Sequence, residues 1–144
     1  MLEQFDPRPA VLIVESEAVI AMLLEDLLAE AGHRTLWVPD AARAVAAAGD
    51  GASFTAAVVD LRLHDGTDGR DILRQLRRRW PALPVVVVTG FDPRAPQAQM
   101  RGLGGPTARL SMPFEWEDLV ALLEDLLGRP AASSRACRRG RHAA

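Results

Sequence analysis

The chain has 144 residues, among them 17 arginines, no lysine and 19 acidic residues, so its formal net charge is −2. Residues 129–144 hold five of the arginines and no acid, which leaves residues 1–128 with 12 arginines and a net charge of −7. An acidic body argues against a general nucleic-acid surface. No run of eighteen apolar residues occurs, and the first nine residues lack the apolar core of a secretory signal, so we expect neither a membrane span nor secretion.

The length of the chain predicts one domain with a core of useful size. The sole cysteine, Cys137, cannot form an internal disulfide, which fits the cytoplasm as the expected location. We expect residues 1–9 to form an N-terminal extension and residues 10–128 to form the domain. Residues 129–144, rich in alanine, serine and arginine, have too little apolar content to fold alone and predict a disordered tail.

Strand and helix patterns alternate along the chain. The first half predicts, in order, a strand over 12–15, a helix over 17–31, a strand over 35–38, a helix over 41–48 and a strand over 54–60. In the first helix, Ile20, Leu24 and Leu27 belong to one apolar stripe, and Gly32 is placed to end it. Asp40 predicts an N-cap for the second helix.

The second half predicts, in order, a helix over 70–80, a strand over 84–89, a short helix around 94–101, a strand over 107–111 and a helix over 115–127. Prolines and glycines interrupt the region around 94–101, so any helix there is short. Arg77, Arg78 and Arg79 close the third helix, where they suit the negative end of the helix dipole and predict a solvated face. Five strands alternating with five helices predict a three-layer α/β sandwich with right-handed crossovers.

Three of the predicted strands end in side chains that carry oxygen atoms. Glu15, Asp60 and Thr89 each follow a run of four apolar residues. Runs this apolar are typical of strands that are buried on both faces of a parallel sheet. Because ligands bind at the carboxyl ends of such strands, we expect the three side chains to line a small acidic pocket. That pocket suits a divalent cation and a phosphoryl group.

Four stretches of the chain match a known family. They are V-L-I-V-E-S-E at 11–17, A-V-V-D-L-R-L-H-D-G-T-D-G at 57–69, V-V-V-V-T-G at 85–90 and M-P-F at 112–114. Over residues 10–127 the chain resembles the receiver domain of two-component response regulators, most specifically around Asp60. The resemblance implies a flavodoxin-like fold with a five-stranded parallel sheet in the order 2-1-3-4-5. It also implies that Asp60 accepts a phosphoryl group from a histidine kinase or a histidine phosphotransfer protein.

The same resemblance implies a metal site and a switch residue. Mg²⁺ would be held by Glu15, Asp60 and the main-chain carbonyl of Arg62, with Ser16 contributing weakly or through water. Thr89 matches the hydroxyl that follows the phosphoryl group and helps to switch the domain. Mg²⁺ keeps several waters and needs only one or two carboxylates, so this reduced set could still hold it weakly.

Three positions depart from the family pattern. Ser16 stands where a second acid usually follows the first strand, Met112 replaces a lysine before a Pro-Phe pair, and Arg109 replaces an aromatic switch residue. The lysine contacts the charge that moves, and losing one such stabiliser costs about 3–4 kcal/mol, or ~10²–10³ in rate. Arg62 and Arg109 are the candidate replacements, but neither sits at the lysine's position. Residues 109 and 112 also face opposite sides of a regular strand.

Enzyme motifs are not found in the sequence, and we expect the chain not to be an enzyme. Without lysine there is no G-x-x-x-x-G-K-[ST] loop, and no G-x-G-x-x-G follows the first strand. Asp65-Gly66-Thr67 is similar to part of the D-x-D-G-T motif of haloacid-dehalogenase phosphatases, but Leu63 stands where the first Asp is required.

Two hypotheses about function stay open. In the first, the chain is a stand-alone receiver that is phosphorylated on Asp60 and signals by contact with a downstream protein. In the second, it is a degenerate receiver that acts as a phosphorylation-independent binding or dimerisation module. Four residues that widen the apolar stripes of the first and last helices, Val19, Met22, Leu28 and Leu122, predict either extra core or a surface for a partner or a homodimer.

Overall fold

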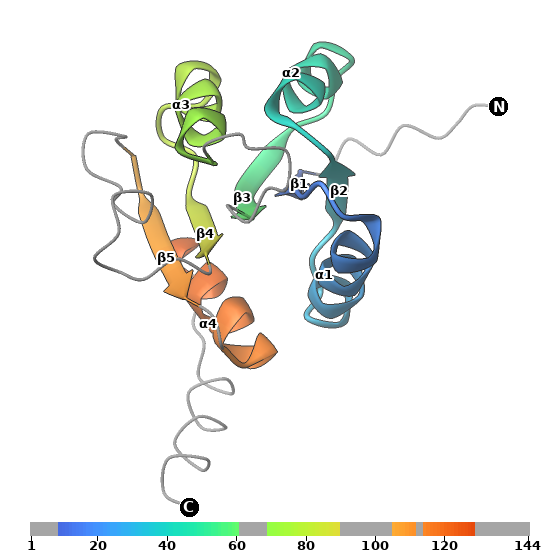
Figure 1. The fold of residues 1–144 in the computed structure, drawn as a ribbon, viewed down its shortest axis with the longest axis vertical. Helices are drawn as coiled ribbons and strands as arrows, with labels where there is room; N and C mark the ends of the chain where they lie inside the picture. The colour runs from blue at the N-terminus through green and yellow to red at the C-terminus, as the bar shows by residue number, and fades with distance from the viewer. Residues whose placement is uncertain (1–8, 61–68, 90–104, 112–113, 129–144) are drawn as a thin grey trace, which may run out of the picture.

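The computed structural model describes residues 9–60, 69–89, 105–111 and 114–128 and shows a sheet between two layers of helices (Figure 1). The strands are β1 (Ala10–Val14), β2 (Thr35–Val38), β3 (Phe54–Asp60), β4 (Val85–Thr89) and β5 (Thr107–Ser111). The helices in these residues are α1 (Ala18–Glu30), α2 (Ala41–Gly49), α3 (Gly69–Arg79) and α4 (Trp116–Leu126). None of the helices in the described ranges is long and apolar enough to cross a lipid bilayer. The expected helix around 94–101, the tail and residues 1–8 of the N-terminal extension lie outside the described residues.

The sheet has the topology that the resemblance to receiver domains implies. Neighbouring strands are all parallel, in the order β2-β1-β3-β4-β5. The nine elements begin and end at most two residues from their predicted limits. The first strand ends at Val14, so Glu15 lies one residue beyond it. Because the strands run in the same direction, the carboxyl ends of β1, β3 and β4 meet at one edge of the sheet.

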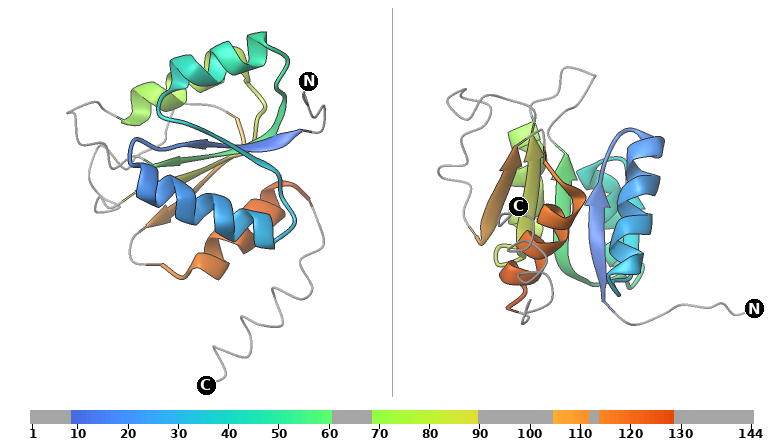
Figure 2. Two further views of the ribbon diagram at one scale, coloured as in Figure 1. Left: turned by 90° about the vertical axis from the view of Figure 1, so that its right-hand side faces the viewer. Right: turned by 90° about the horizontal axis from the view of Figure 1, so that it is seen from below.

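Helices cover both faces of the sheet, with α1 and α4 on one face and α2 and α3 on the other (Figure 2). Successive strand residues serve opposite layers. In β1, Val11 and Ile13 pack in the core under α1 and α4, whereas Leu12 and Val14 pack in the core under α2 and α3. Burial on both faces explains why the strand sequences are continuous apolar runs.

Two predicted helix boundaries are confirmed by their capping contacts. Gly32 follows α1 with a φ of 93°, and the N–H of His33 donates to the Leu28 carbonyl at 2.9 Å, as in a Schellman motif. Asp40 precedes α2, and its carboxylate accepts a hydrogen bond from the Arg43 N–H at 2.9 Å. These contacts join residues close in sequence, which is why the pattern could predict them.

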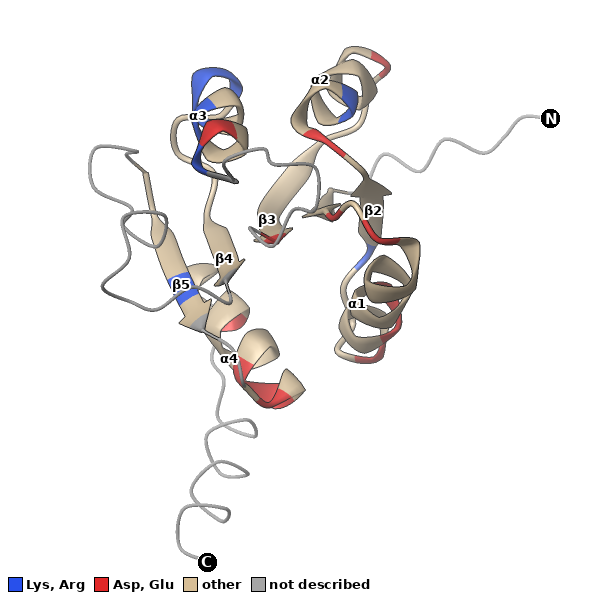
Figure 3. Cartoon of the chain, in the orientation of Figure 1, with Lys and Arg blue, Asp and Glu red and all other residues tan. Residues whose placement is uncertain are grey.

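Charge is segregated between the two helical layers (Figure 3). Helices α1 and α4 together carry seven acidic residues and no arginine. Helices α2 and α3 carry six arginines and one acidic residue. One layer of helices is therefore acidic and the other is basic, although the net charge of the chain is small.

Arg77 corrects the prediction of a solvated arginine face at the end of α3. The residue is only 8% exposed. Its guanidinium donates hydrogen bonds to five acceptors, the carbonyl oxygens of Trp80, Pro81, Leu83 and Pro106 and the hydroxyl of Thr107. Burial lowers the pKa of the Arg77 guanidinium below its ordinary value of 12.5. The acceptors replace the water that the buried cation gives up. Arg78 and Arg79 are exposed, as predicted.

The start of β5 packs directly against the Arg77 guanidinium. Gly105 has a φ of 67°, and a Cβ at this position would overlap the guanidinium of Arg77. Both the positive φ and the lack of space for a Cβ require glycine at position 105. The bonds from Arg77 to Pro106 and Thr107 measure 2.9 Å and 2.8 Å, so they tie α3 to the edge strand of the sheet.

Replacing Arg77 with methionine removes the donor of five hydrogen bonds, one buried and four part-buried, and we expect it to lower the free energy of unfolding by about 3 kcal/mol. Arg78→Met, at the next position and exposed, is the matched control and should stay within about 0.5 kcal/mol of the parent. Urea denaturation followed by circular dichroism measures both variants. Equal stability of the two variants would show that the Arg77 network contributes nothing net to the fold.

Candidate functional site

Glu15 and Asp60 lie side by side at the carboxyl edge of the sheet. Val14 of β1 pairs with Val59 of β3, so the two acids follow one residue later on neighbouring strands, which are about 4.8 Å apart. Glu15 is 0% exposed and Asp60 is 2% exposed. The structure therefore brings together two carboxylates that the sequence assigned to one pocket, and it buries both.

The position of Glu15 is fixed by contacts on three sides. Its Oε2 accepts a hydrogen bond from the backbone N–H of Glu17 at 3.0 Å, just before α1 begins. Its backbone N–H donates to the Val38 carbonyl at 3.1 Å, and its carbonyl accepts from Nε1 of Trp37 at 2.7 Å. Trp37 is absent from the predicted site because its contact depends on the pairing of β1 with β2. The network holds the carboxylate in place before any ligand binds.

Like charges on two buried carboxylates of neighbouring strands repel each other, and a cation between them removes the repulsion. Their oxygen atoms are the hard ligands that Mg²⁺ prefers. Within the described ranges, no group of three or more acidic, histidine or cysteine side chains is placed to hold a metal. The donor set of Glu15 and Asp60 therefore fits an ion that keeps several of its waters, as Mg²⁺ does.

The remaining predicted site residues are placed only in part. Thr89 ends β4, and its backbone lies one residue beyond Val88, which pairs with Asp60, but its side chain lies outside what the structure describes. Ser16 is exposed directly after Glu15. The carbonyl of Arg62 and the side chain of Met112 also lie outside the described residues, as does the Met112-Pro113 bond. Glu15 and Asp60 are thus the two predicted site residues that the structure places in buried surroundings.

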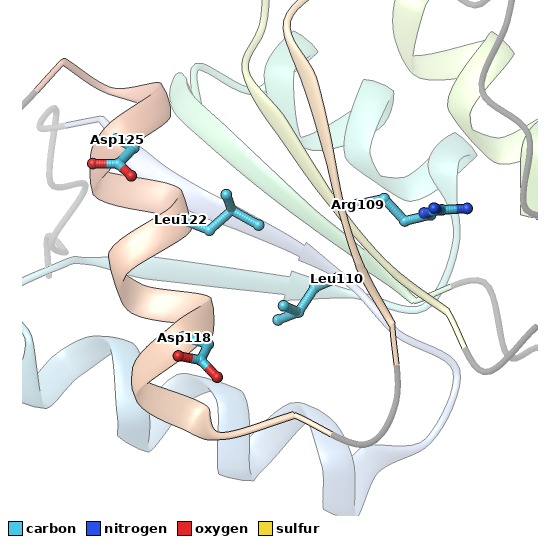
Figure 4. A pocket seen from close by; sticks show the side chains of 5 residues that line it. All are labelled: Arg109, Leu110, Asp118, Leu122 and Asp125. Atoms are coloured by element: carbon cyan, nitrogen blue, oxygen red, sulfur yellow. The ribbon is translucent and has the colours of Figure 1, made fainter. Parts of the chain in front are cut away.

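Arg109 lies on β5 at the side of the sheet away from α4. It pairs with Val87 of β4, so its backbone is two strands, roughly 10 Å, from the strand that carries Asp60. Its side chain points to the opposite side of β5 from Leu110 (Figure 4). The pocket drawn in Figure 4 is lined by Arg109 and Leu110 of β5 and by Asp118, Leu122 and Asp125 of α4. This geometry gives no support to Arg109 as a replacement for the lysine, because strand alternation predicts that position 112 shares the side of Leu110 and not that of Arg109.

A family model that describes the response regulator receiver domain matches residues 11–124. The chain belongs to this family. The match covers all nine elements apart from the first residue of β1 and the last two residues of α4. The flavodoxin-like order of the strands is that of a receiver domain.

Curated relatives of this receiver are two-component regulators. The two-component response regulator PhoP of Pseudomonas aeruginosa is 34% identical over 119 residues, which cover 82% of the chain and 51% of PhoP. The photosynthetic apparatus regulatory protein RegA of Rhodovulum sulfidophilum is 35% identical over 118 residues, which cover 80% of the chain and 61% of RegA. The chain therefore spans about half the length of the curated relatives that it matches.

Solved receiver structures have the same fold. The receiver domain of NtrX from Brucella abortus is 29% identical, with a TM-score of 0.67 over 83% of the chain and 99% of that domain. The receiver domain of the sensor histidine kinase PA1611 from Pseudomonas aeruginosa, solved with a magnesium ion in its active site cleft, has a TM-score of 0.68. It is 24% identical and aligns over 84% of the chain and 99% of that domain, so this likeness shows the fold alone.

Replacing Glu15 with glutamine keeps the shape of the side chain and removes one of two neighbouring buried charges. We expect the free energy of unfolding, measured in urea with a chelator present, to rise by about 1–3 kcal/mol. Asp50→Asn removes a charge at an exposed position and should change it by less than about 0.5 kcal/mol. A Glu15→Gln variant no more stable than the parent would show that the two carboxylates do not repel each other in the folded chain.

Proposed function

We propose that this receiver accepts a phosphoryl group on Asp60 and signals by contact with another protein. The position of Asp60 carries the proposal, because its carboxylate ends the central strand of the sheet beside the buried carboxylate of Glu15. A cation held between two such groups makes a carboxylate usable as an acceptor of a phosphoryl group. The proposed donor is a histidine kinase or a histidine phosphotransfer protein, and the proposed location is the cytoplasm.

In the proposed reaction a phosphoryl group passes from a histidine nitrogen of the donor protein to a carboxylate oxygen of Asp60. An oxygen of the Asp60 carboxylate attacks the phosphorus of a phosphohistidine, and the new O–P bond replaces the N–P bond. The imidazole leaves with the electron pair and takes up a proton, which leaves an aspartyl phosphate and a histidine. The chain is thus an acceptor in the reaction rather than an enzyme that turns over.

Mg²⁺ is the proposed cofactor, because the buried carboxylates of Glu15 and Asp60 are hard oxygen ligands of the kind that it prefers. The PA1611 receiver, which has the same fold, was solved with a magnesium ion in its active site cleft. When bound, the ion would neutralise negative charge on the carboxylates and on the transferring group. Glu15 and Asp60 would hold it, with the main-chain carbonyl of Arg62 as a further ligand and Ser16 acting through water. The hydroxyl of Thr89 would bind the transferred group and report it to the rest of the domain.

Met112 sets the expected speed of the reaction. A lysine at this position would place a positive charge on the group that moves, and methionine cannot. Losing one stabiliser of this kind lowers a rate by ~10²–10³. We therefore propose that Asp60 is phosphorylated slowly compared with receivers that have the lysine.

A second candidate function is a binding module that works without phosphorylation. Two substitutions favour it, namely the exposed Ser16 in place of a second acid and Met112 in place of the lysine. In this case the buried acids would be an inherited feature of the fold, and contacts of the helices with a partner or a second copy would carry the function.

Incubation of the chain with acetyl phosphate and Mg²⁺, followed by intact-mass spectrometry, tests the phosphoacceptor function. We expect a slowly formed phosphoryl adduct on the parent and none on Asp60→Asn. Met112→Lys should form the adduct about 10²-fold faster, because it restores the missing positive charge, and Met112→Leu should match the parent. If neither the parent nor Met112→Lys is labelled, the chain is a binding module and not a phosphoacceptor.

Mg²⁺ titration followed by tryptophan fluorescence tests the metal site. Trp37 donates to the carbonyl of Glu15, so we expect millimolar Mg²⁺ to change its emission. The response should disappear in Trp37→Phe and in Glu15→Gln, and chelation should reverse it. Trp80→Phe should keep the response, because Trp80 packs against Phe54 in the core under α2 and α3. A response that survives in Glu15→Gln would place the ion elsewhere.

A further inference from the structure

The pocket between β5 and α4 combines two carboxylates with an apolar centre (Figure 4). Asp118 and Asp125 stand seven residues apart on α4, so both lie on the same side of the helix. Leu122 of α4 and Leu110 of β5 point toward each other between them. With a volume of about 270 Å³, the pocket suits a few side chains of an extended segment rather than a folded element.

The helix that lines this pocket is acidic along its length. α4 carries four acidic residues and no basic one. Glu124 and Asp125 belong to its last turn, where carboxylates oppose the helix dipole and a cation is favoured. Arg109 also lines the pocket, but its side chain points to the opposite side of β5 from Leu110. A carboxylate has about four lone-pair sites, so the interactions that Asp118 and Asp125 already make leave room for further hydrogen bonds.

Residues 129–144 follow α4 in the chain and are strongly basic. They include five arginines and no acidic residue. Gly128 precedes them with a φ of 74°, and its N–H donates to the Asp125 carbonyl at 3.1 Å. A left-handed residue of this kind ends a helix and changes the direction of the chain, and Pro130 cannot continue the helix. The basic segment therefore begins four residues after Asp125.

The basic segment is long enough to reach both carboxylates. The seven positions from Asp118 to Asp125 correspond to about 10 Å along the helix axis. The low apolar content of the segment predicts no fold of its own, so we take it as extended. An extended chain advances about 3.3 Å per residue, so the stretch from Arg129 to Arg135 spans up to about 20 Å. An arginine can therefore reach each end of the pocket.

The covalent connection favours this segment over a separate molecule as the occupant of the pocket. Surface ion pairs are individually weak. A segment joined to its site by a short linker has an effective concentration in the millimolar range, so a weak contact is enough to fill the site. The other layer of helices would repel the segment, because α2 and α3 carry six arginines and one acidic residue.

We propose that the arginine-rich segment 129–144 docks across the pocket between β5 and α4 of its own domain. Arg129 lies near Asp125, Arg135 lies near Asp118, and the alanines between the two arginines cover the two leucines of the pocket. Any partner that binds this pocket then competes with the segment, and its apparent affinity falls with the docked fraction. The contact is separate from the phosphoacceptor site and does not depend on its chemistry.

The sole cysteine of the chain, Cys137, belongs to this segment and can carry a spin label for the test. In the ¹⁵N-labelled full chain, a nitroxide on Cys137 broadens the amide signals of the residues near it. We expect broadening along α4 and β5 and none in α2 and α3, which lie on the other face of the sheet (Figure 2). The broadening should fade at about 1 M salt, where the Debye length falls to about 3 Å.

Matched variants separate docking from simple attachment to the end of α4. Asp118→Asn combined with Asp125→Asn should lower the ratio of docked to undocked segment about fivefold and reduce the broadening accordingly. Asp26→Asn combined with Glu30→Gln removes two exposed charges from α1, in the same layer of helices, and should leave the broadening unchanged. Circular dichroism checks that both variants fold.

A second variant changes the other side of the contact and leaves the residues of the pocket intact. Arg129→Gln combined with Arg135→Gln should reduce the broadening as much as the pocket variant does. Equal broadening in the parent, the pocket variant and this arginine variant would show that the segment is only attached near α4, and would overturn the proposal.

Two further results would also overturn it. Broadening that is strongest outside α4 and β5 would place the segment on another surface. In a mixture of ¹⁵N-labelled chain without nitroxide and unlabelled chain with nitroxide, we expect no broadening. Broadening of α4 and β5 in that mixture would assign the pocket to the segment of a second copy of the chain.

Discussion

β1 and β3 pair in parallel through residues that are buried on both sides, and this pairing delivers Glu15 and Asp60 to neighbouring positions at one edge of the sheet. The apolar contacts of the two cores hold the strands together, so the fold tolerates two like charges where an isolated pocket would not. The N-terminal end of α1 helps, because the Glu15 carboxylate accepts from the Glu17 N–H beside the positive end of the helix dipole. The phosphoacceptor chemistry proposed for Asp60 would depend on this arrangement, because a cation that relieved the repulsion would also neutralise the charge of the transferring group.

Arg77 holds β5, which is the edge strand at the other end of the sheet from β2. β5 is an edge strand with β4 as its neighbour, so the sheet alone fixes it on one side. The Arg77 guanidinium provides the second attachment through the Pro106 carbonyl and the Thr107 hydroxyl. β5 also carries Arg109 and leads toward Met112, two of the positions where this receiver departs from its family. Because Arg77 holds β5, we expect those departures to affect the chemistry of the site rather than the place of the strand.

The helices and strands were predictable from the sequence because their signals are local: apolar runs, helical periodicity, and caps such as Gly32 and Asp40 that act within a few residues. The order of the strands came from the resemblance to receiver domains, because no local signal contains it. The site was predictable as far as Glu15 and Asp60, because each follows a strand whose end the pattern marks. Arg77 could not be separated from its exposed neighbours, since two of its acceptors lie 29 and 30 residues further along the chain. The Trp37 contact with Glu15 spans 22 residues and likewise depends on strand pairing. Four apolar helix residues looked equivalent in the sequence, yet Leu28 and Leu122 pack against the core whereas Val19 and Met22 face outward.

The candidate site and the outer side of α1 share one helix, which bears on the two candidate functions. Glu15 accepts a hydrogen bond from the backbone N–H of Glu17, and the exposed Val19 follows two residues later. If phosphorylation of Asp60 and the binding of a partner are coupled, the factor by which the phosphoryl group changes the affinity for the partner equals the factor by which the partner changes the equilibrium for that group. The first hypothesis requires a factor different from one, whereas the second requires a factor of one.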